Sequence, residues 1–140
     1  VGMASVTDYC FATKYASVKL SELSIGIGPF VVGPPIERKI GLAAFSQLTI
    51  NATEWQSAQW AKEKGLFAEM YESAKEMDAS ILILAKKLAS SNPDSMRSLK
   101  QVMWEGTDHW DILLMKRAAM SGKGVLSDFT RETLARLKQG

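Results

Sequence analysis

The sequence has very little of what disulfide-bonded, metal-binding or membrane-spanning proteins need. It contains one cysteine, Cys10, and one histidine, His109. A single cysteine excludes an internal disulfide and favours a reducing compartment, so we expect a cytoplasmic protein. Because His109 has no cysteine or glutamate at metal-ligand spacing, we expect no metal site. No apolar run approaches the roughly 20 residues that cross a bilayer, so we expect no membrane partner.

An excess of charge of either sign is also missing. Seventeen basic and fifteen acidic residues give a net charge of +2, and no dense basic run is interleaved with aromatic residues. We therefore expect no nucleic-acid partner. With 46% hydrophobic and 23% charged residues among 140, the chain has the composition of one soluble domain with a hydrophobic core.

Strand-forming residues are concentrated near the N-terminus. Aromatic and β-branched residues within 8–20 predict two short paired strands joined by a tight connection. Glycines and prolines mark a loop over residues 26–35, and a helix is expected to follow through Phe45 or Leu48. A second helix is expected between a Thr53 cap and Gly65.

The remainder of the sequence predicts mainly helices. A short strand is expected over residues 66–71, and Ser73, Asn92 and Ser127 each precede an amphipathic segment as helix caps do. The segment "SGKG" at residues 121–124 is typical of a turn. We expect an α/β part over residues 1–72 and a helical subdomain over residues 73–140.

One carboxylate in the N-terminal part requires explanation. Glu22 interrupts the apolar run "VKLSELSIGIGP", between Leu20 and Leu23. An ionised carboxylate in such surroundings must be exposed, paired or protonated, because burial disfavours its charged form. Protonation at neutral pH is how enzymes obtain acids and bases, although for an arbitrary glutamate a solvent-facing position is more common.

The segment "DYCFATKYASVKLSELSIGIGPFVVGPPIERKIG" resembles the second half of the crotonase superfamily, the enoyl-CoA hydratase and isomerase family. "ATEWQSAQWAKEKGLFAEMY" resembles the segment that follows there, so the resemblance spans nearly the whole chain. The residues that occur in the family's order are Asp8, Ala12, Glu22, Gly26, Pro29, Arg38 and Gly41.

This resemblance implies the C-terminal portion of a crotonase-like (ClpP/crotonase spiral) α/β fold. Residues 1–72 would belong to its core, and residues 73–140 would form a helical trimerisation subdomain. The implied substrate is an acyl-CoA thioester, with no separate cofactor, and the implied assembly is a homotrimer or hexamer. By the same resemblance, Glu22 is a catalytic glutamate that moves the proton at the carbon next to the thioester.

Two departures from the family bear on the reaction. The first of its two catalytic glutamates falls at Gly2 of this sequence, which favours isomerisation by Glu22 alone as the alternative to hydration. The backbone donors that hold the thioester oxygen belong to segments upstream of Val1. Since an oxyanion hole supplies a large electrostatic contribution, we expect this segment by itself to be inactive and to belong to a longer protein.

The loop after Glu22 implies a substrate pocket formed by Gly28, Pro29, Phe30 and Val31. Its large side chains are similar to those of methylglutaconyl-CoA hydratases, which implies a branched, carboxylated enoyl-CoA from leucine breakdown. Arg38 or Lys39 would pair with that carboxylate, although solvated helix charges are the more common role.

In the family, an aromatic and a basic residue of the last helix help to hold CoA, often in a neighbouring subunit. Phe129 is the aromatic candidate here, and Arg131, Arg136 or Lys138 is the basic one. An alternative of another class remains open: a noncatalytic helical interaction module, in which Glu22 has no chemical role.

Overall fold

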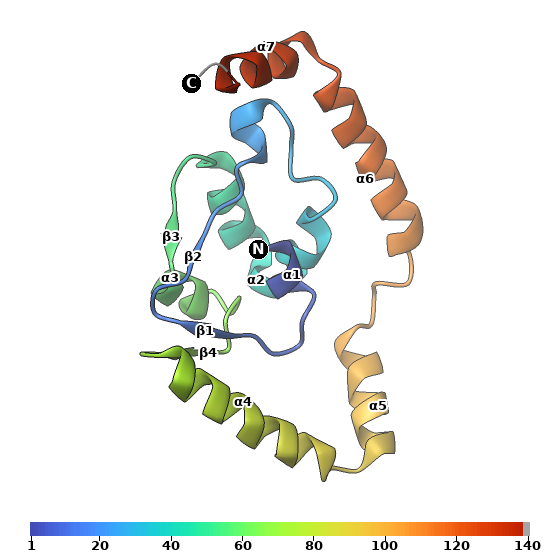
Figure 1. Ribbon diagram of the computed structural model, residues 1–140. Coiled ribbons are helices and arrows are strands. Elements are labelled where there is room, and N and C mark those ends of the chain that lie inside the picture. The colour runs from blue at the N-terminus through green and yellow to red at the C-terminus, as the bar shows by residue number, and fades with distance from the viewer. Residues whose placement is uncertain (139–140) are drawn as a thin grey trace.

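The computed structural model describes residues 1–138, so the last two residues of the predicted 73–140 subdomain lie outside it. Figure 1 shows a central part, built from the first half of the chain, and an arc of four helices that runs around it. The arc consists of α4 (Ala74–Ala89), α5 (Pro93–Met103), α6 (Trp110–Val125) and α7 (Asp128–Leu137).

The two predicted N-terminal strands form, but they do not pair with each other. After the short helix α1 (Gly2–Ser5), β1 (Phe11–Thr13) pairs in parallel with β4 (Glu69–Tyr71). β2 (Ser17–Val18) pairs antiparallel with β3 (Gln56–Ser57). The predicted hairpin was wrong because the turn after Thr13, closed by the Ala16 N–H to the Thr13 carbonyl at 3.0 Å, leads the chain into a second sheet.

The central helix α2 (Gly33–Ile50) begins at the predicted prolines and bends at Gly41, whose φ of 78° lies in the left-handed region. The following helix, α3 (Ala58–Glu63), begins later than predicted. Ser57 is its cap, accepting the Trp60 N–H at 3.1 Å, because the preceding residues are extended in β3. The Thr53 cap was therefore wrong, whereas Gly65, with φ of 81°, ends the turn as expected.

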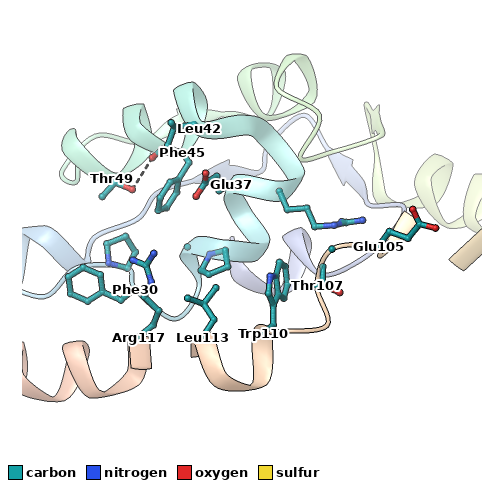
Figure 2. Close-up of a pocket in the computed structure, with 15 residues that line it drawn as sticks. Phe30, Glu37, Leu42, Phe45, Thr49, Glu105, Thr107, Trp110, Leu113 and Arg117 are labelled. Atoms are coloured by element: carbon teal, nitrogen blue, oxygen red, sulfur yellow. Dashed lines mark hydrogen bonds between the residues drawn. The ribbon is translucent and has the colours of Figure 1, made fainter. Parts of the chain in front are cut away.

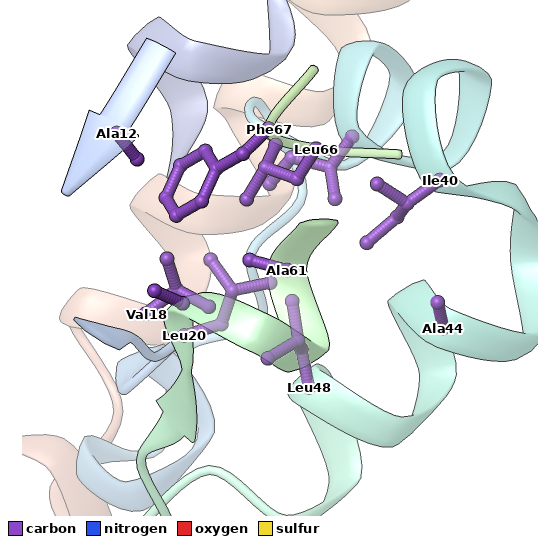
Figure 3. Close-up of a cluster of buried hydrophobic side chains, with 11 residues drawn as sticks. Ala12, Val18, Leu20, Ile40, Ala44, Leu48, Ala61, Leu66 and Phe67 are labelled. Carbon is purple, nitrogen blue, oxygen red and sulfur yellow. The ribbon is translucent and has the colours of Figure 1, made fainter. Parts of the chain in front are cut away.

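The hydrophobic core lies between α2, α3 and the short strands (Figure 3). Its largest fully buried apolar side chains are Ile36, Leu48 and Leu66. Ala58 and Ala61 are also almost completely buried, and their small side chains allow α3 to approach the strands closely. The core is thus made by the central part alone.

The helices of the arc begin where the sequence predicts. Ser73, Asn92 and Ser127 each accept a backbone N–H in the first turn, at 3.2, 2.9 and 3.3 Å respectively. The turn predicted at 121–124 is instead the last part of α6. Among the described residues of α4, α5 and α6 none is fully buried, so these helices leave apolar side chains exposed.

The Asp8 carboxylate fastens α5 to the central part. It accepts hydrogen bonds from Lys100 Nζ and Trp104 Nε1, both at 2.6 Å. Arg38 of α2 lies over the Trp104 ring, with its guanidinium carbon 4.4 Å from the ring centroid. Partial burial by itself would raise the pKa of Asp8, but the hydrogen bonds from Lys100 and Trp104 and the charges of Lys100 and Lys39 hold that pKa below its ordinary value.

We predict that Asp8→Asn lowers the free energy of unfolding of the full-length protein by about 1 kcal/mol near pH 7. This is the contribution of a hydrogen bond to a charged group, reduced because the Asp8 side chain is partly exposed to water. Because the folded-state pKa is depressed, the Asp8 contribution is present above the ordinary value of 3.8 and is lost as the pH falls through the folded value. Urea titrations of both proteins from pH 7 to pH 3 measure the difference. Asp78→Asn, on the exposed face of α4, is the control, and an equal, pH-independent loss in both variants would contradict this role for Asp8.

Candidate functional site

Two neighbouring cavities meet at the loop between the 3₁₀ helix η1 (Glu22–Ile25) and α2. The smaller, of about 110 Å³, is lined by Glu22, Ile27, Gly28, Pro29, Phe30, Val31, Val32 and Ser121. The larger, of about 590 Å³, lies between α2 and the α5–α6 segment and also contains Pro29 and Phe30. All four predicted pocket residues of the loop therefore lie together with Glu22 at the smaller cavity.

Glu22 is the first residue of the 3₁₀ helix η1 (Glu22–Ile25). The turn is closed by its carbonyl, which accepts the Ile27 N–H at 3.0 Å. The side chain is half-buried, and among residues 1–138 its carboxylate takes part in no hydrogen bond or ion pair. Glu22 is thus neither fully exposed nor paired, and its carboxylate is available to a ligand in the smaller cavity.

Gly28 shapes the boundary between the cavities. The Phe30 N–H donates to the Gly28 carbonyl at 2.7 Å, which folds the loop back on itself. A Cβ at Gly28 would collide with the Phe30 ring, so only glycine lets the ring lie over the backbone at this point. Phe30 consequently lines both cavities.

Gly2, where the family resemblance predicts that the first glutamate is missing, lies behind the wall of the smaller cavity. A Cβ at Gly2 would lie 3.2 Å from Cγ1 of Val32, one of the lining residues. A larger side chain at Gly2 therefore requires Val32 to move. Among the described residues, Glu22 is the one ionisable side chain that lines the smaller cavity.

The larger cavity has apolar walls with charged groups at intervals (Figure 2). Phe45 and Leu42 of α2 lie across from Trp110 and Leu113 of α6. Its ionisable lining residues are Glu37, Arg38, Glu105 and Arg117. The sequence prediction missed the contribution of α6 to this cavity. The available signal was the spacing of Trp110, Leu113, Arg117 and Ser121, which lie three or four residues apart and therefore on one face of the helix.

The two cations predicted to meet a substrate carboxylate have other contacts. Arg38 lies over Trp104, and Lys39 Nζ donates to the carbonyls of Thr7 and Asp8 at 2.9 and 3.0 Å. Lys39 lines neither cavity. Arg38 therefore helps to hold α5 in place, and Lys39 helps to hold the N-terminal segment.

Phe129 and Arg131 lie outside both cavities. Phe129 is 59% exposed, and Arg131 faces Asp128 of its own helix at 3.9 Å. Between them, Thr130 is fully buried against Gly26, at the point where α7 meets η1. The chain therefore does not bring the predicted CoA-contacting residues of α7 to its own Glu22.

Other titratable groups lie away from the cavities. Burial raises the pKa of the Cys10 thiol, which opposes a role as nucleophile. At the β1–β4 edge, Glu69 accepts hydrogen bonds from Tyr71 and Tyr9, which lower its pKa. Residues 1–138 contain no cluster of three metal-ligating side chains, and no helix within that range has the length and apolarity to span a membrane.

The chain matches the protein-family model described as enoyl-CoA hydratase/isomerase over residues 1–128. No curated protein matches the chain.

Several solved structures have the same fold. An enoyl-CoA hydratase/isomerase from Pseudoalteromonas atlantica superposes with a TM-score of 0.87 at 18% identity, over 99% of this chain and 56% of the other. A carnitinyl-CoA hydratase from Mycobacterium avium gives 0.84 at 19%, over 98% and 54%. An enoyl-CoA hydratase from Mycobacterium avium gives 0.82 at 24%, over 99% and 54%. The chain thus spans about half the length of these structures, and the predicted crotonase-like α/β fold is confirmed.

We predict that Gly26→Ala detaches α7 from η1. Gly26 has φ of +82°, and a Cβ there would lie 2.5 Å from the Phe129 ring and 2.7 Å from Thr130 Oγ1. The expected loss is about 1–2 kcal/mol from the left-handed backbone and about 1–3 kcal/mol from the contact. Hydrogen exchange of the α7 amides in the full-length protein measures the detachment.

Gly106→Ala is the matched control, because Gly106 has φ of +80° and open space around it. It should show the backbone loss alone and leave α7 protected. Equal protection of α7 in both variants would mean that contact with Gly26 does not hold the helix.

Proposed function

We propose that this chain, which belongs to the enoyl-CoA hydratase/isomerase family, carries the proton-transfer residue of an enzyme that hydrates an enoyl-CoA thioester. The observation that supports the proposal is the Glu22 carboxylate, half-buried and without an intramolecular partner, at a cavity lined by the Gly28–Val31 loop. Since the chain spans about half of the structures that it resembles, the activity is proposed for the full-length protein.

In this proposal, the carboxyl of Glu22 donates its proton to C2 of the acyl chain, the carbon next to the thioester. At the same time the oxygen of a water molecule bonds to C3. The product is a 3-hydroxyacyl thioester, and the water proton returns the catalyst to its starting form. The apolar side chains of Ile27, Pro29 and Val31 suit this chemistry, because they limit solvation of the carboxylate. The enolate oxygen is assigned to backbone N–H donors outside this chain, as the family resemblance implies.

Isomerisation of the double bond is the second candidate, and one observation favours it. The smaller cavity has Glu22 as its one ionisable lining residue within 1–138, and the family resemblance implies that Gly2 stands at the place of the first glutamate. One carboxylate suffices to remove a proton from one carbon and return it to another. Hydration also needs a group that orients water, and Ser121 is the polar side chain available at the cavity.

For the acyl group we propose a short, branched and carboxylated enoyl-CoA of the 3-methylglutaconyl type. The support is the bulky loop: Phe30 and Val31 narrow the cavity near Glu22, and the larger cavity begins at the same Phe30. The thioester itself carries CoA, so the proposed reaction uses no further cofactor.

We also propose a homotrimer or hexamer in the cytoplasm. The support for assembly is the set of exposed apolar side chains on the arc, which a monomer would leave in water. They include Leu82, Ile83, Leu99, Val102, Ile112 and Met115, from 56% to 77% exposed.

We predict that Glu22→Gln in the full-length protein lowers kcat for its enoyl-CoA substrate by about 10²–10⁴-fold and leaves the affinity for the thioester nearly unchanged. Glutamine keeps the shape but cannot exchange a proton, and one positioned acid–base group contributes about this much. Steady-state kinetics across straight and branched enoyl-CoAs measure the effect. Glu54→Gln, at an exposed turn, is the control.

The reaction in D₂O separates the candidates. A hydratase yields a 3-hydroxyacyl product with deuterium next to the thioester, whereas an isomerase yields a moved double bond and no hydroxyl. If no thioester reacts and Glu22→Gln behaves like the parent protein, the noncatalytic interaction module replaces the enzyme.

We predict that the full-length protein has three or six times the protomer mass by light scattering at micromolar concentration. The apolar surface of α4–α6 would then be covered by neighbouring copies. Replacing Ile112 and Met115 together by glutamate should shift the mass toward the monomer, because buried charges in a subunit interface are costly. A monomeric parent protein would contradict the proposed assembly.

A further inference from the structure

Arg117 is a half-buried cation without a carboxylate partner. It lies in the middle of α6 and lines the larger cavity. Among residues 1–138 its guanidinium takes part in no ion pair. Arg38, the other arginine of the cavity, lies over the Trp104 ring and holds α5. Of the two, Arg117 is therefore the one available to an anion in the cavity.

The position of Arg117 connects the two cavities. Ser121, one helical turn further along α6, lines the smaller cavity with Glu22, and its Oγ donates to the Arg117 carbonyl at 3.4 Å. Residues four apart on a helix lie about 6 Å apart along its axis. Figure 2 shows the Arg117 side chain rising from α6 toward Phe30, the residue that both cavities share.

The surroundings of Arg117 favour a carboxylate over a neutral group. Phe30 and Leu113 lie beside it in the cavity, and an ion pair is stronger next to apolar side chains than in open water. The planar guanidinium also matches a carboxylate with two parallel hydrogen bonds.

The acidic residues of the cavity restrict where such a carboxylate can bind. Figure 2 shows Glu37 on the α2 wall and Glu105 at the far end from Phe30. Glu105 repels an anion that enters the far end of the cavity, and Glu37 repels one that approaches the α2 wall. The lining attracts a carboxylate at the Arg117 end, next to Phe30, whereas Arg38, the other cation of the cavity, lies over the Trp104 ring.

We propose that Arg117 determines substrate specificity by binding a carboxylate on the acyl group, so that the substrates are carboxylated rather than neutral acyl-CoA thioesters. This inference rests on the proposed function, because it assumes that the thioester lies at Glu22. The acyl chain then passes Phe30 and ends in the larger cavity. Arg117 takes no part in the chemical step and sets which acyl group is held there.

Binding of two saturated thioesters to the full-length protein tests the proposal by titration calorimetry, without turnover. Glutaryl-CoA ends in a carboxylate, and hexanoyl-CoA is a neutral thioester of similar length. Arg117→Met should weaken glutaryl-CoA binding by about 10- to 100-fold, the range expected for a hydrogen-bonded charge, and should change hexanoyl-CoA binding by less than about twofold. Arg117→Lys should retain part of the preference, because it keeps the charge without the planar fork.

Arg97→Met is the control, since Arg97 lies on the exposed face of α5 and pairs with Asp94. Arg117→Gln repeats the test with a polar replacement if the methionine variant does not fold. Equal weakening of both thioesters, or no change in either, overturns the role of Arg117 while the proposed function stands. If the parent protein binds neither thioester, the proposed function itself fails and the inference fails with it.

Discussion

The Asp8 carboxylate attaches the middle of the helical arc to the central part, while α4 contacts β1 and β4 at the start of the arc. Asp8 receives Lys100 and Trp104 from α5, and the same indole lies against Arg38 of α2. At the other end of the arc, α7 meets η1 through buried Thr130 and Gly26. Between these two attachments α6 extends past the loop before α2 (Figure 1). The larger cavity exists because α6 is held at both ends and its middle does not close onto α2.

Local sequence signals predicted what depends on local physics. The caps at Ser73, Asn92 and Ser127 are formed within one helical turn, so the residues themselves contain the information. The pairing of β1 with β4 was not predictable in this way, because the partner strand is more than fifty residues away in the sequence. Thr53 failed as a cap for the same reason: β3 extends the chain up to Ser57 by pairing with β2.

The residues of the candidate site differ in the same way: some follow from the local sequence, and others are brought in by tertiary structure. Glu22 and the loop 28–31 are contiguous in the sequence, and the resemblance to a family identified them before the structure brought them to one cavity. Arg117 and Ser121 reach that loop only through the path of α6, which the sequence does not specify. The predicted use of Arg38 and Lys39 did not anticipate that both would be engaged by the Asp8 region. Contacts of this kind are tertiary, and periodicity alone does not assign a helix face to its partner.

The placement of α7 connects the site to assembly. Its buried Thr130 fixes the helix on η1, where the Phe129 ring lies against Gly26, and both Phe129 and Arg131 lie outside the cavity that Glu22 lines. By the family resemblance, a CoA-binding role for these two residues would be exercised at the cavity of a second copy. The exposed apolar residues of α4–α6 give a physical reason for such a copy to be present, since covering them removes apolar area from water. If Phe129 and Arg131 bind CoA, the site then includes residues of two chains, and loss of assembly would weaken thioester binding even with every residue near Glu22 unchanged.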